Sequence, residues 1–153
     1  MNSQKQLIIK QLDDKIQKLR HASGQIAPSN GWIRAIRTAL KIPRRSIAKK
    51  LGISEPTLLG IEERELEGTV SLKTLRETAA TMDLALVYGF VPKDGSLRAY
   101  IRKKAREAAT KIVLRTAHTM ALEDQGISNR RIKAAIKEKA QELESRLPSF
   151  LWD

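Results

Sequence analysis

The chain has 153 residues, enough for one hydrophobic core or for one core with extensions. It contains 29 Lys+Arg against 17 Asp+Glu, a net charge of +12, which favours an anionic partner such as nucleic acid. The absence of cysteine excludes disulfides and thiolate metal sites. No apolar run approaches the roughly 20 residues that span a bilayer, and the first residues have no signal-peptide pattern. We therefore expect a cytoplasmic protein that does not bind membranes.

The first predicted element is an amphipathic helix over residues 3–20. Its apolar residues recur at spacings of four, four and three, which places them on one helix face: Ile8, Leu12, Ile16 and Leu19. The following stretch, residues 21–31, contains glycine, proline and serine and predicts a linker. We therefore assign residues 1–30 to an N-terminal helix and linker.

Residues 41–62 have the pattern of two short helices joined by a tight turn. The first helix is expected to end at Gly52, because a residue with positive φ is commonly needed at that position. Ser54 is a good N-cap for the second helix, and Pro56 fits its first turn. This pattern predicts a helix-turn-helix, which places its second helix in the DNA major groove. An ordinary helical hairpin has the same local pattern and stays an alternative.

The charge of this region favours DNA over the plain hairpin. Between residues 34 and 50 no acid interrupts seven cations: Arg34, Arg37, Lys41, Arg44, Arg45, Lys49 and Lys50. Such a run favours salt-dependent binding to phosphates. We expect three of these side chains to contact the DNA backbone: Arg44, Arg45 and Lys49. The residues expected to face the groove lie at the start of the second helix: Ser54, Glu55, Thr57 and Leu59.

Residues 32–82 resemble the phage-repressor (XRE-like) helix-turn-helix domain, through RAIRTALKIPRRSIAKKLGISEPTLLGIE and SLKTLRETAATM. We assign residues 31–84 to this DNA-binding domain. The resemblance implies that Arg37 of the first helix pairs with Glu62 at the end of the recognition helix. A partly buried pair of this kind would tie the two helices together. Two independent surface charges are the alternative.

The recognition helix departs from the pattern of that family at the positions that read bases. These positions carry Glu55, Pro56 and Gly60, and no Arg or Gln is present to read a purine. Glu55 can accept from a cytosine amino group, and Thr57 or Leu59 can touch a thymine methyl. We therefore expect either modest specificity, or specificity that comes from DNA shape, dimer spacing or flanking arms.

Residues 84–92, LALVYGFVP, are rich in β-branched and aromatic residues and predict one short strand, assigned to residues 85–92. A lone strand needs a partner from this chain, a second copy or another protein, and we expect it to hold a homodimer. Residues 96–153 predict a long helix and a second helix capped by Ser128. The predicted fold class is all-α: a phage-repressor-like helix-turn-helix core with one short strand and N- and C-terminal helical extensions.

The sequence shows no pattern typical of an enzyme. His21 and His118 lie far apart, and neither has a metal-ligand spacing such as HExxH. There is no Gly-rich phosphate loop and no serine in a GxSxG context. We therefore expect no catalytic residue, no metal and no cofactor.

The whole chain resembles the mobile mystery protein A family. The matching pieces are IIKQLDDK, GWIRAIRTAL, EGTVSLKTLRETA, HTMALEDQ and the terminal LWD. Members are typically encoded on integrated mobile elements beside a protein with a Fic domain. The resemblance therefore implies a DNA-binding, antitoxin-like regulator that binds its own operator as a dimer and contacts a Fic-domain toxin through residues 96–153. Two alternatives are an inhibitor of the Fic protein with weak DNA binding and a stand-alone repressor.

The resemblance also points to an inhibitory helix. Fic inhibitors carry a Ser or Thr, three residues, a Glu and then a Gly or Asn, and the Glu pairs with an active-site Arg that would otherwise hold ATP. Thr119 and Glu123 have this spacing, but position 124 is Asp. The i, i+4 spacing puts both on one helix face. The alternative is an ordinary helix end with exposed acids.

Overall fold

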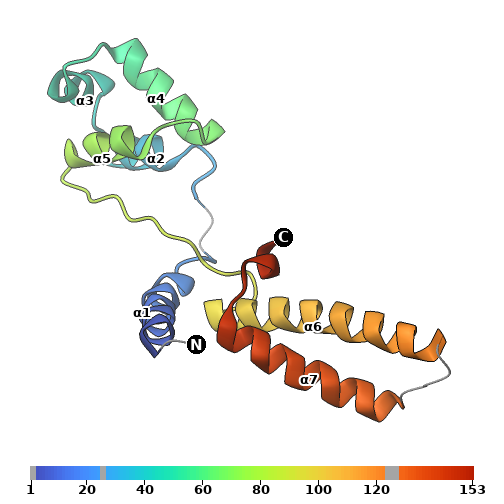
Figure 1. Ribbon diagram of the computed structural model, residues 1–153. Coiled ribbons are helices and arrows are strands. Elements are labelled where there is room, and N and C mark those ends of the chain that lie inside the picture. Colours follow the sequence, from blue (N-terminus) through green and yellow to red (C-terminus); the bar gives the residue numbers. More distant parts are fainter. Residues whose placement is uncertain (1–2, 25–26, 123–127) are drawn as a thin grey trace. The chain divides into compact units, whose positions relative to one another are not determined.

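The computed structural model describes residues 3–24, 27–122 and 128–153. All regular structure in these ranges is helical, as Figure 1 shows, so the predicted all-α class is confirmed for them. The chain divides into two compact units, one formed by Gly24–Gly89 and the other by Met1–Ser23 with Phe90–Asp153. Within the described ranges, no helix combines the length and the apolar character needed to cross a membrane.

The Gly24–Gly89 unit is built from four short helices. They are α2 (Trp32–Ala39), α3 (Arg44–Leu51), α4 (Glu55–Glu67) and α5 (Leu72–Ala80). Buried side chains of α2, α3 and α4 form one core, against which the half-buried Leu75 of α5 packs: Ile33, Ile47, Ala48, Leu58 and Ile61. This burial is what stabilises such short helices, since isolated helices of this length are marginal in water.

The connection between α3 and α4 follows the predicted chemistry. Gly52 ends α3 in the left-handed region, with φ 68° and ψ 31°. The Ser54 hydroxyl accepts from the Thr57 N–H at 3.3 Å and so caps α4. Residues 52–54 thus connect two helices that share one core.

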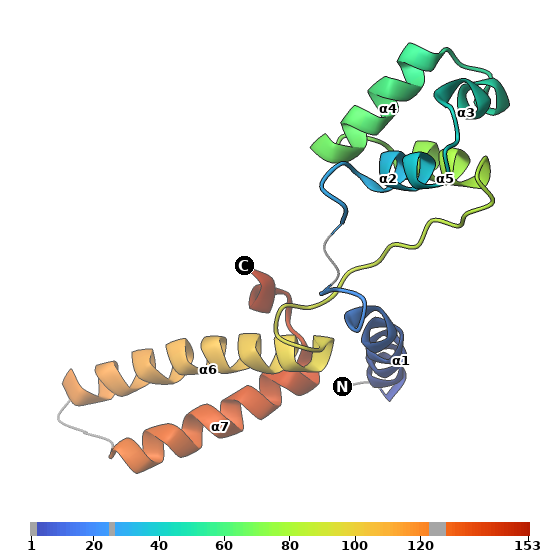
Figure 2. The ribbon, with the colours of Figure 1, turned by 180° about the vertical axis from the view of Figure 1, so that it is seen from behind.

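The second unit contains α1 (Ser3–Arg20), α6 (Leu97–Leu122), α7 (Asn129–Arg146) and a terminal 3-10 helix, η1 (Ser149–Trp152). Helices α6 and α7 run side by side as a hairpin, seen from two sides in Figures 1 and 2. Their shared core is rich in alanine, and Leu151 of η1 closes it: Ala105, Ala109, Ala140, Leu143 and Leu151. Next to it, Trp152 stacks on Tyr100 with ring centroids 5.7 Å apart.

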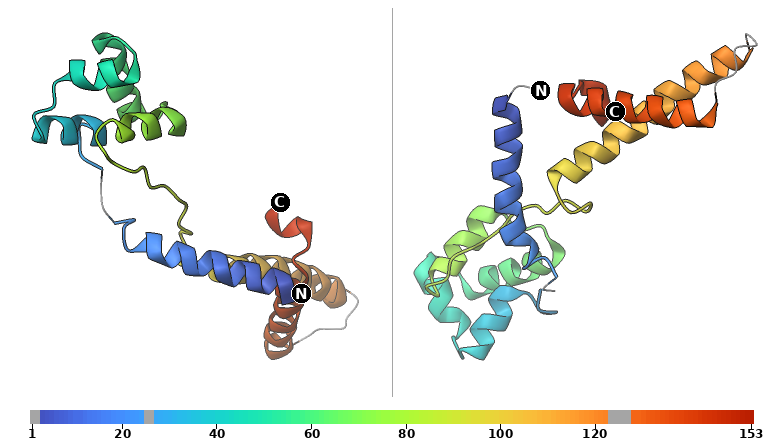
Figure 3. Two further views of the ribbon diagram at one scale, coloured as in Figure 1. Left: turned by 90° about the vertical axis from the view of Figure 1, so that its left-hand side faces the viewer. Right: turned by 90° about the horizontal axis from the view of Figure 1, so that it is seen from below.

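Helix α1 holds the N-terminus of α6, and Figure 3 shows the two helices from two directions. The Asp13 carboxylate accepts from the N–H groups of Leu97 at 2.7 Å and Arg98 at 3.3 Å. Arg20 and Gln17 donate to the Gly95 carbonyl at 2.8 and 3.2 Å. The first N–H groups of a helix have no partner within it, so a carboxylate is stabilising at this end.

Helix α1 has the predicted bounds, but its buried face differs in part from the predicted apolar face. Ile8 and Leu12 are exposed, Ile16 and Leu19 are half-buried, and Asp13 is buried. A face that carries a capping carboxylate cannot be found from apolar periodicity, because periodicity counts Asp13 as a solvent-facing residue.

The strand predicted over residues 85–92 is wrong for this chain: the segment has no ladder, and the described residues contain no strand. β-branched residues favour an extended backbone, but a strand also needs a second segment to bond with. The segment is an irregular connection between α5 and α6 instead. Val87 and Phe90 remain 76% and 87% exposed.

We predict that Asp13→Ala lowers the free energy of unfolding of the α1–α6–α7 unit by about 1–2 kcal/mol, because two N–H groups at the start of α6 lose their acceptor. Asp14→Ala is the matched control, since Asp14 is an exposed neighbour on the same helix. Urea unfolding followed by circular dichroism measures both. Equal stability of the two variants would contradict the capping role.

Candidate nucleic-acid interface

Helix α4 connects to α2 through two carboxylates, Glu62 and Glu65, which lie three residues apart on one helix face. The Glu65 oxygens accept from the N–H groups of Trp32 at 2.9 Å and Ile33 at 3.1 Å. Glu65 therefore caps α2, whose N-cap residue is Gly31 with φ 80°. A Cβ at Gly31 would lie 3.0 Å from the Glu65 carboxylate, so this close approach favours glycine.

The second carboxylate, Glu62, lies at the centre of an arginine cluster. Its side chain is fully buried. Arg37 donates from Nε to Oε1 at 2.6 Å and from Nη2 to Oε2 at 3.3 Å. Arg34 donates from Nε to Oε2 at 3.0 Å, and the Nε of Arg44 lies 3.6 Å from the same oxygen. The structure thus places Arg37 against Glu62 and adds Arg34 and Arg44 to the pair.

This cluster keeps Glu62 ionised and leaves a surplus of positive charge. Burial would raise the pKa of the Glu62 carboxyl, but hydrogen bonds from Arg37 and Arg34 and the charges of Arg37 and Arg44 together lower it below its ordinary value. One carboxylate faces three guanidinium groups. Because Arg44 remains 40% exposed and Arg34 27% exposed, part of this surplus reaches solvent.

The exposed side of α3 carries further cations. Arg45 and Lys49 are both exposed and lie four residues apart, which places them on one helix face. Lys50 is engaged elsewhere, since its ammonium donates to the Thr81 carbonyl at the end of α5 at 2.8 Å. We call the exposed surface formed by Arg45, Lys49 and the outer part of Arg44 the α3 edge. It can attract phosphate groups without breaking any interaction inside the unit.

The predicted groove-facing residues divide into two groups. Glu55 and Thr57 are exposed in the first turn of α4. Ser54 is exposed, but its hydroxyl already caps α4 and lies 2.7 Å from the Thr57 hydroxyl. Leu59 is half-buried. Of the four predicted residues, Glu55 and Thr57 are therefore the two that lie on α4 and are exposed.

The rest of α4 is acidic. Beyond the first turn, Glu63 and Glu67 are exposed, and Arg64 is the basic residue of the last turn. Exposed carboxylates repel phosphates, so the later turns of α4 are poorly suited to face a phosphate backbone. Helix α3, in contrast, contains no acidic residue, and its edge presents exposed cations.

The predicted partner-inhibitory residues lie in the other unit. Thr119 is exposed in the last turns of α6, where its hydroxyl donates to the Arg115 carbonyl at 3.1 Å. Glu123 lies outside the described residues. Among the residues that the structure does describe, no group of three or more His, Asp or Glu side chains could hold a metal ion.

Sequence reasoning missed Arg34 and Arg44 as members of the Glu62 cluster and Glu65 as a cap. A signal for Arg34 and Glu65 exists: Arg34 precedes Arg37 by one helical turn, and Glu65 follows Glu62 by one turn. Arg44 carries no such signal, because it belongs to another helix and only the tertiary fold brings it to Glu62.

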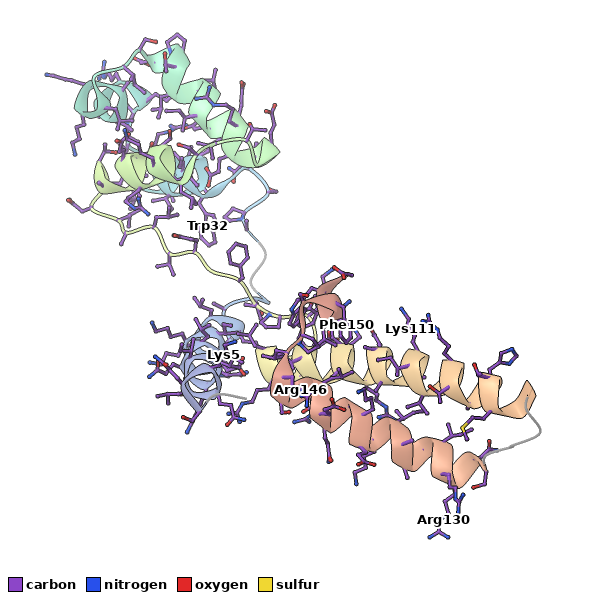
Figure 4. The ribbon with its side chains drawn as sticks, in the orientation of Figure 1. Lys5, Trp32, Lys111, Arg130, Arg146 and Phe150 are labelled. Carbon is purple, nitrogen blue, oxygen red and sulfur yellow. The ribbon has the colours of Figure 1, made fainter. Side chains whose placement is uncertain are left out.

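We predict that Glu62→Ala lowers the free energy of unfolding of the Gly24–Gly89 unit by roughly 3–5 kcal/mol, because it leaves buried guanidinium charge without a partner. Glu63→Ala, an exposed change on the same helix, should stay within about 0.5 kcal/mol. Trp32, labelled in Figure 4 at the start of α2, reports this unit by fluorescence in a Trp152→Phe background.

The Glu62 carboxyl also predicts how the stability of the Gly24–Gly89 unit depends on pH. Because the folded-state pKa of Glu62 is lowered, its contribution is complete above the unfolded-state value of about 4.3 and is lost as pH falls through the folded-state value. Unfolding measured from pH 7 to pH 3 should show this loss in the parent chain. A Glu62→Ala protein as stable as the parent at pH 7 would contradict the buried cluster.

Comparisons of the chain with protein-family models, with curated proteins and with solved structures found no match.

Proposed function

We propose that the Gly24–Gly89 unit is a helix-turn-helix DNA-binding domain of the phage-repressor type and that the protein is a transcriptional regulator. The observation that carries this proposal is the α3 edge, which lies directly before the turn at Gly52 and the capped first turn of α4. A helix-turn-helix uses the first helix on the DNA backbone and the start of the second helix in the major groove. The positions of the cations and of Glu55 and Thr57 suit these two roles.

In this mode, Arg45 and Lys49 bind phosphates, and Arg44 adds a contact through its exposed end. Arg44 has two tasks, because its Nε is buried beside Glu62. Glu55 accepts from a cytosine amino group, and Thr57 touches a thymine methyl. Two such interactions give little discrimination in one half-site. Binding as a homodimer to two half-sites supplies the rest of the specificity.

The resemblance to the mobile mystery protein A family adds a protein partner to this proposal. In this reading, the regulator is the antitoxin-like member of a pair and binds a Fic-domain protein through its C-terminal helices. The acidic outer surface of α4 favours a second candidate, an inhibitor of the Fic protein with weak DNA binding. DNA affinity separates these two readings.

We predict that Arg45→Ala with Lys49→Ala weakens binding to the protein's own promoter and to a random duplex alike. Loss of two phosphate contacts should also reduce the slope of log affinity against log salt by about two. Fluorescence anisotropy with both duplexes at several salt concentrations measures the effect. This pair is preferable to Arg44 with Arg45, because removal of Arg44 also disturbs the Glu62 cluster.

The matched control is Lys73→Ala with Arg76→Ala. Both residues are exposed on α5 of the same unit, and the change in charge is the same. The control pair should keep the parent salt slope. If both pairs change the slope equally, binding depends on net charge alone, and the α3 edge is not the DNA-binding surface.

For the partner, we predict that Glu123→Gly leaves the complex with the Fic protein assembled but releases its nucleotidyl-transfer activity. A carboxylate that pairs with a phosphate-binding Arg competes with ATP, and glycine removes that carboxylate. Activity is measured after size-exclusion chromatography has shown an intact complex. Full inhibition by the Glu123→Gly protein would assign Glu123 to an ordinary helix end.

A further inference from the structure

The helical hairpin carries a groove that the proposed DNA contact does not use. Two adjoining hollows of about 420 and 660 Å³ lie along α6 and α7, and the N-terminal helix α1 borders the smaller one. Both hollows are lined by Arg102, Gln141 and Glu144, so they form one continuous depression. We call it the α6/α7 groove. All of its lining residues belong to one compact unit.

The walls of this groove are cationic. One wall is a ladder on α6 with one residue per helical turn: Arg98, Arg102 and Arg106. The α7 wall has a pair with the same spacing, Lys133 and Lys137, which lines the larger hollow together with Arg102 and Arg106. Arg98 borders the smaller hollow, where the α7 wall is polar. All five side chains are exposed. In the part of the chain that the structure describes, none of them forms an ion pair. Among the described residues that line the groove, the single acid is Glu144.

The floor of the groove is apolar. Ile9, Ile101 and Ile136 are half-buried there, and Ala140 is buried between the helices. A cationic rim above an apolar floor fits a ligand with the opposite pattern. That ligand needs an apolar stripe toward the floor and carboxylates on both sides of the stripe.

We propose that the α6/α7 groove binds an acidic amphipathic helix of a protein partner, which packs along the α6/α7 hairpin. The lining residues of α6 extend from Arg98 to Thr110, about 18 Å of helix, which matches a guest helix of roughly three turns. Two antiparallel helices leave a furrow that a third helix fills with its side chains. Charge complementarity then fixes which helix is accepted, because a basic one is repelled by both walls.

The apolar floor favours a helix over DNA as the occupant. A phosphate backbone gains from the arginines and lysines but presents little apolar surface to Ile101 and Ile136. An amphipathic helix uses both features, which is the recurring helix-in-groove mode of recognition. The inference rests on the proposed role of the C-terminal helices in binding a protein partner, and it names the chemistry of that partner.

The test uses a synthetic acidic peptide of about 15 residues with leucines at i, i+3 and i+4 positions and glutamates beside them. A peptide of the same composition in scrambled order, without the apolar stripe, is its control. Isothermal titration calorimetry with the full chain measures both affinities. We expect the amphipathic peptide to bind at least about tenfold more tightly than the scrambled one.

Charge reversal then locates the site. Arg102→Glu with Lys137→Glu should weaken peptide binding by about tenfold or more. The control is Lys111→Glu with Arg130→Glu, which makes the same change in charge on the same two helices. Lys111 and Arg130 are labelled in Figure 4 and project away from the contact between α6 and α7, and neither lines the groove. The control should keep its affinity within about twofold.

Thermal melting followed by circular dichroism checks that each variant is folded. If Arg102→Glu with Lys137→Glu fails to fold, Arg102→Ala with Lys137→Ala removes the same attraction without placing new acids beside Glu144, and it should weaken peptide binding in the same direction.

Three outcomes would overturn the proposal. If the scrambled peptide binds as tightly as the amphipathic one, charge alone explains the binding, and the apolar stripe does not contribute. Equal losses in the two charge-reversed proteins would place the site elsewhere. Displacement of the peptide by duplex DNA, with DNA binding lost only in the Arg102 and Lys137 variant, would make the groove a nucleic-acid surface.

These outcomes do not depend on whether the proposed function is correct, because the peptide assay contains neither promoter DNA nor a Fic protein. If the chain binds no acidic peptide but still co-purifies with a Fic protein, the proposed helix-binding role of the groove is wrong, and the proposed partner stands. If the chain binds the peptide through Arg102 and Lys137 but does not bind the Fic protein, the proposed partner is wrong, and the role of the groove stands.

Discussion

The buried carboxylate of Glu62 is the interaction on which the Gly24–Gly89 unit depends. It accepts from Arg37 and Arg34 of α2 and lies beside Arg44 at the start of α3, so one side chain of α4 joins three helices. Burying a charge is costly unless it is paired and hydrogen-bonded. Here the surrounding arginines satisfy it and lower its pKa. The arrangement of the helices that would present the α3 edge to DNA is therefore tied to one ion cluster.

The same chemistry recurs at two helix starts. Glu65 caps α2 from α4, and Asp13 caps α6 from α1. In each case a carboxylate from another helix satisfies two free N–H groups. The small cores explain why this matters, since alanines make up much of the α6 and α7 contact and supply little buried apolar area. Hydrogen bonds to these carboxylates therefore contribute more to the rotation of each helix and to the residue at which it begins.

Local signals predicted the local features well. Apolar periodicity and caps gave the bounds of α1 and the chemistry at Gly52, Ser54 and Ser128. Features that depend on distant parts of the chain were missed for a physical reason. Asp13 lies 84 residues from Leu97, and no spacing rule links them. The strand over residues 85–92 failed similarly, because residue preference favours extended backbone but only a partner segment makes a strand.

The candidate site was predictable to the extent that its residues act within one helix. The exposed positions of Arg45 and Lys49 follow from the apolar face of α3, since residues outside that face must point to solvent. The role of Arg44 does not follow, because its distance to Glu62 depends on the packing of α3 against α4. A residue that looked like a free phosphate ligand thus shares its charge with the core of the unit.

The acids of this basic chain explain why two of its surfaces remain cationic. Glu65 and Asp13 are used as helix caps, and Glu62 pairs with arginines inside the unit, so Arg45 and Lys49 of the α3 edge and the cations of the α6/α7 groove are not paired with them. The two surfaces differ in what remains when salt screens charge. The α3 edge has only charge to offer a phosphate backbone, and its attraction falls steeply with ionic strength. The groove also has an apolar floor, whose contribution salt does not screen. Under the two proposals, binding of a partner helix in the α6/α7 groove should therefore depend less on ionic strength than binding of DNA to the α3 edge.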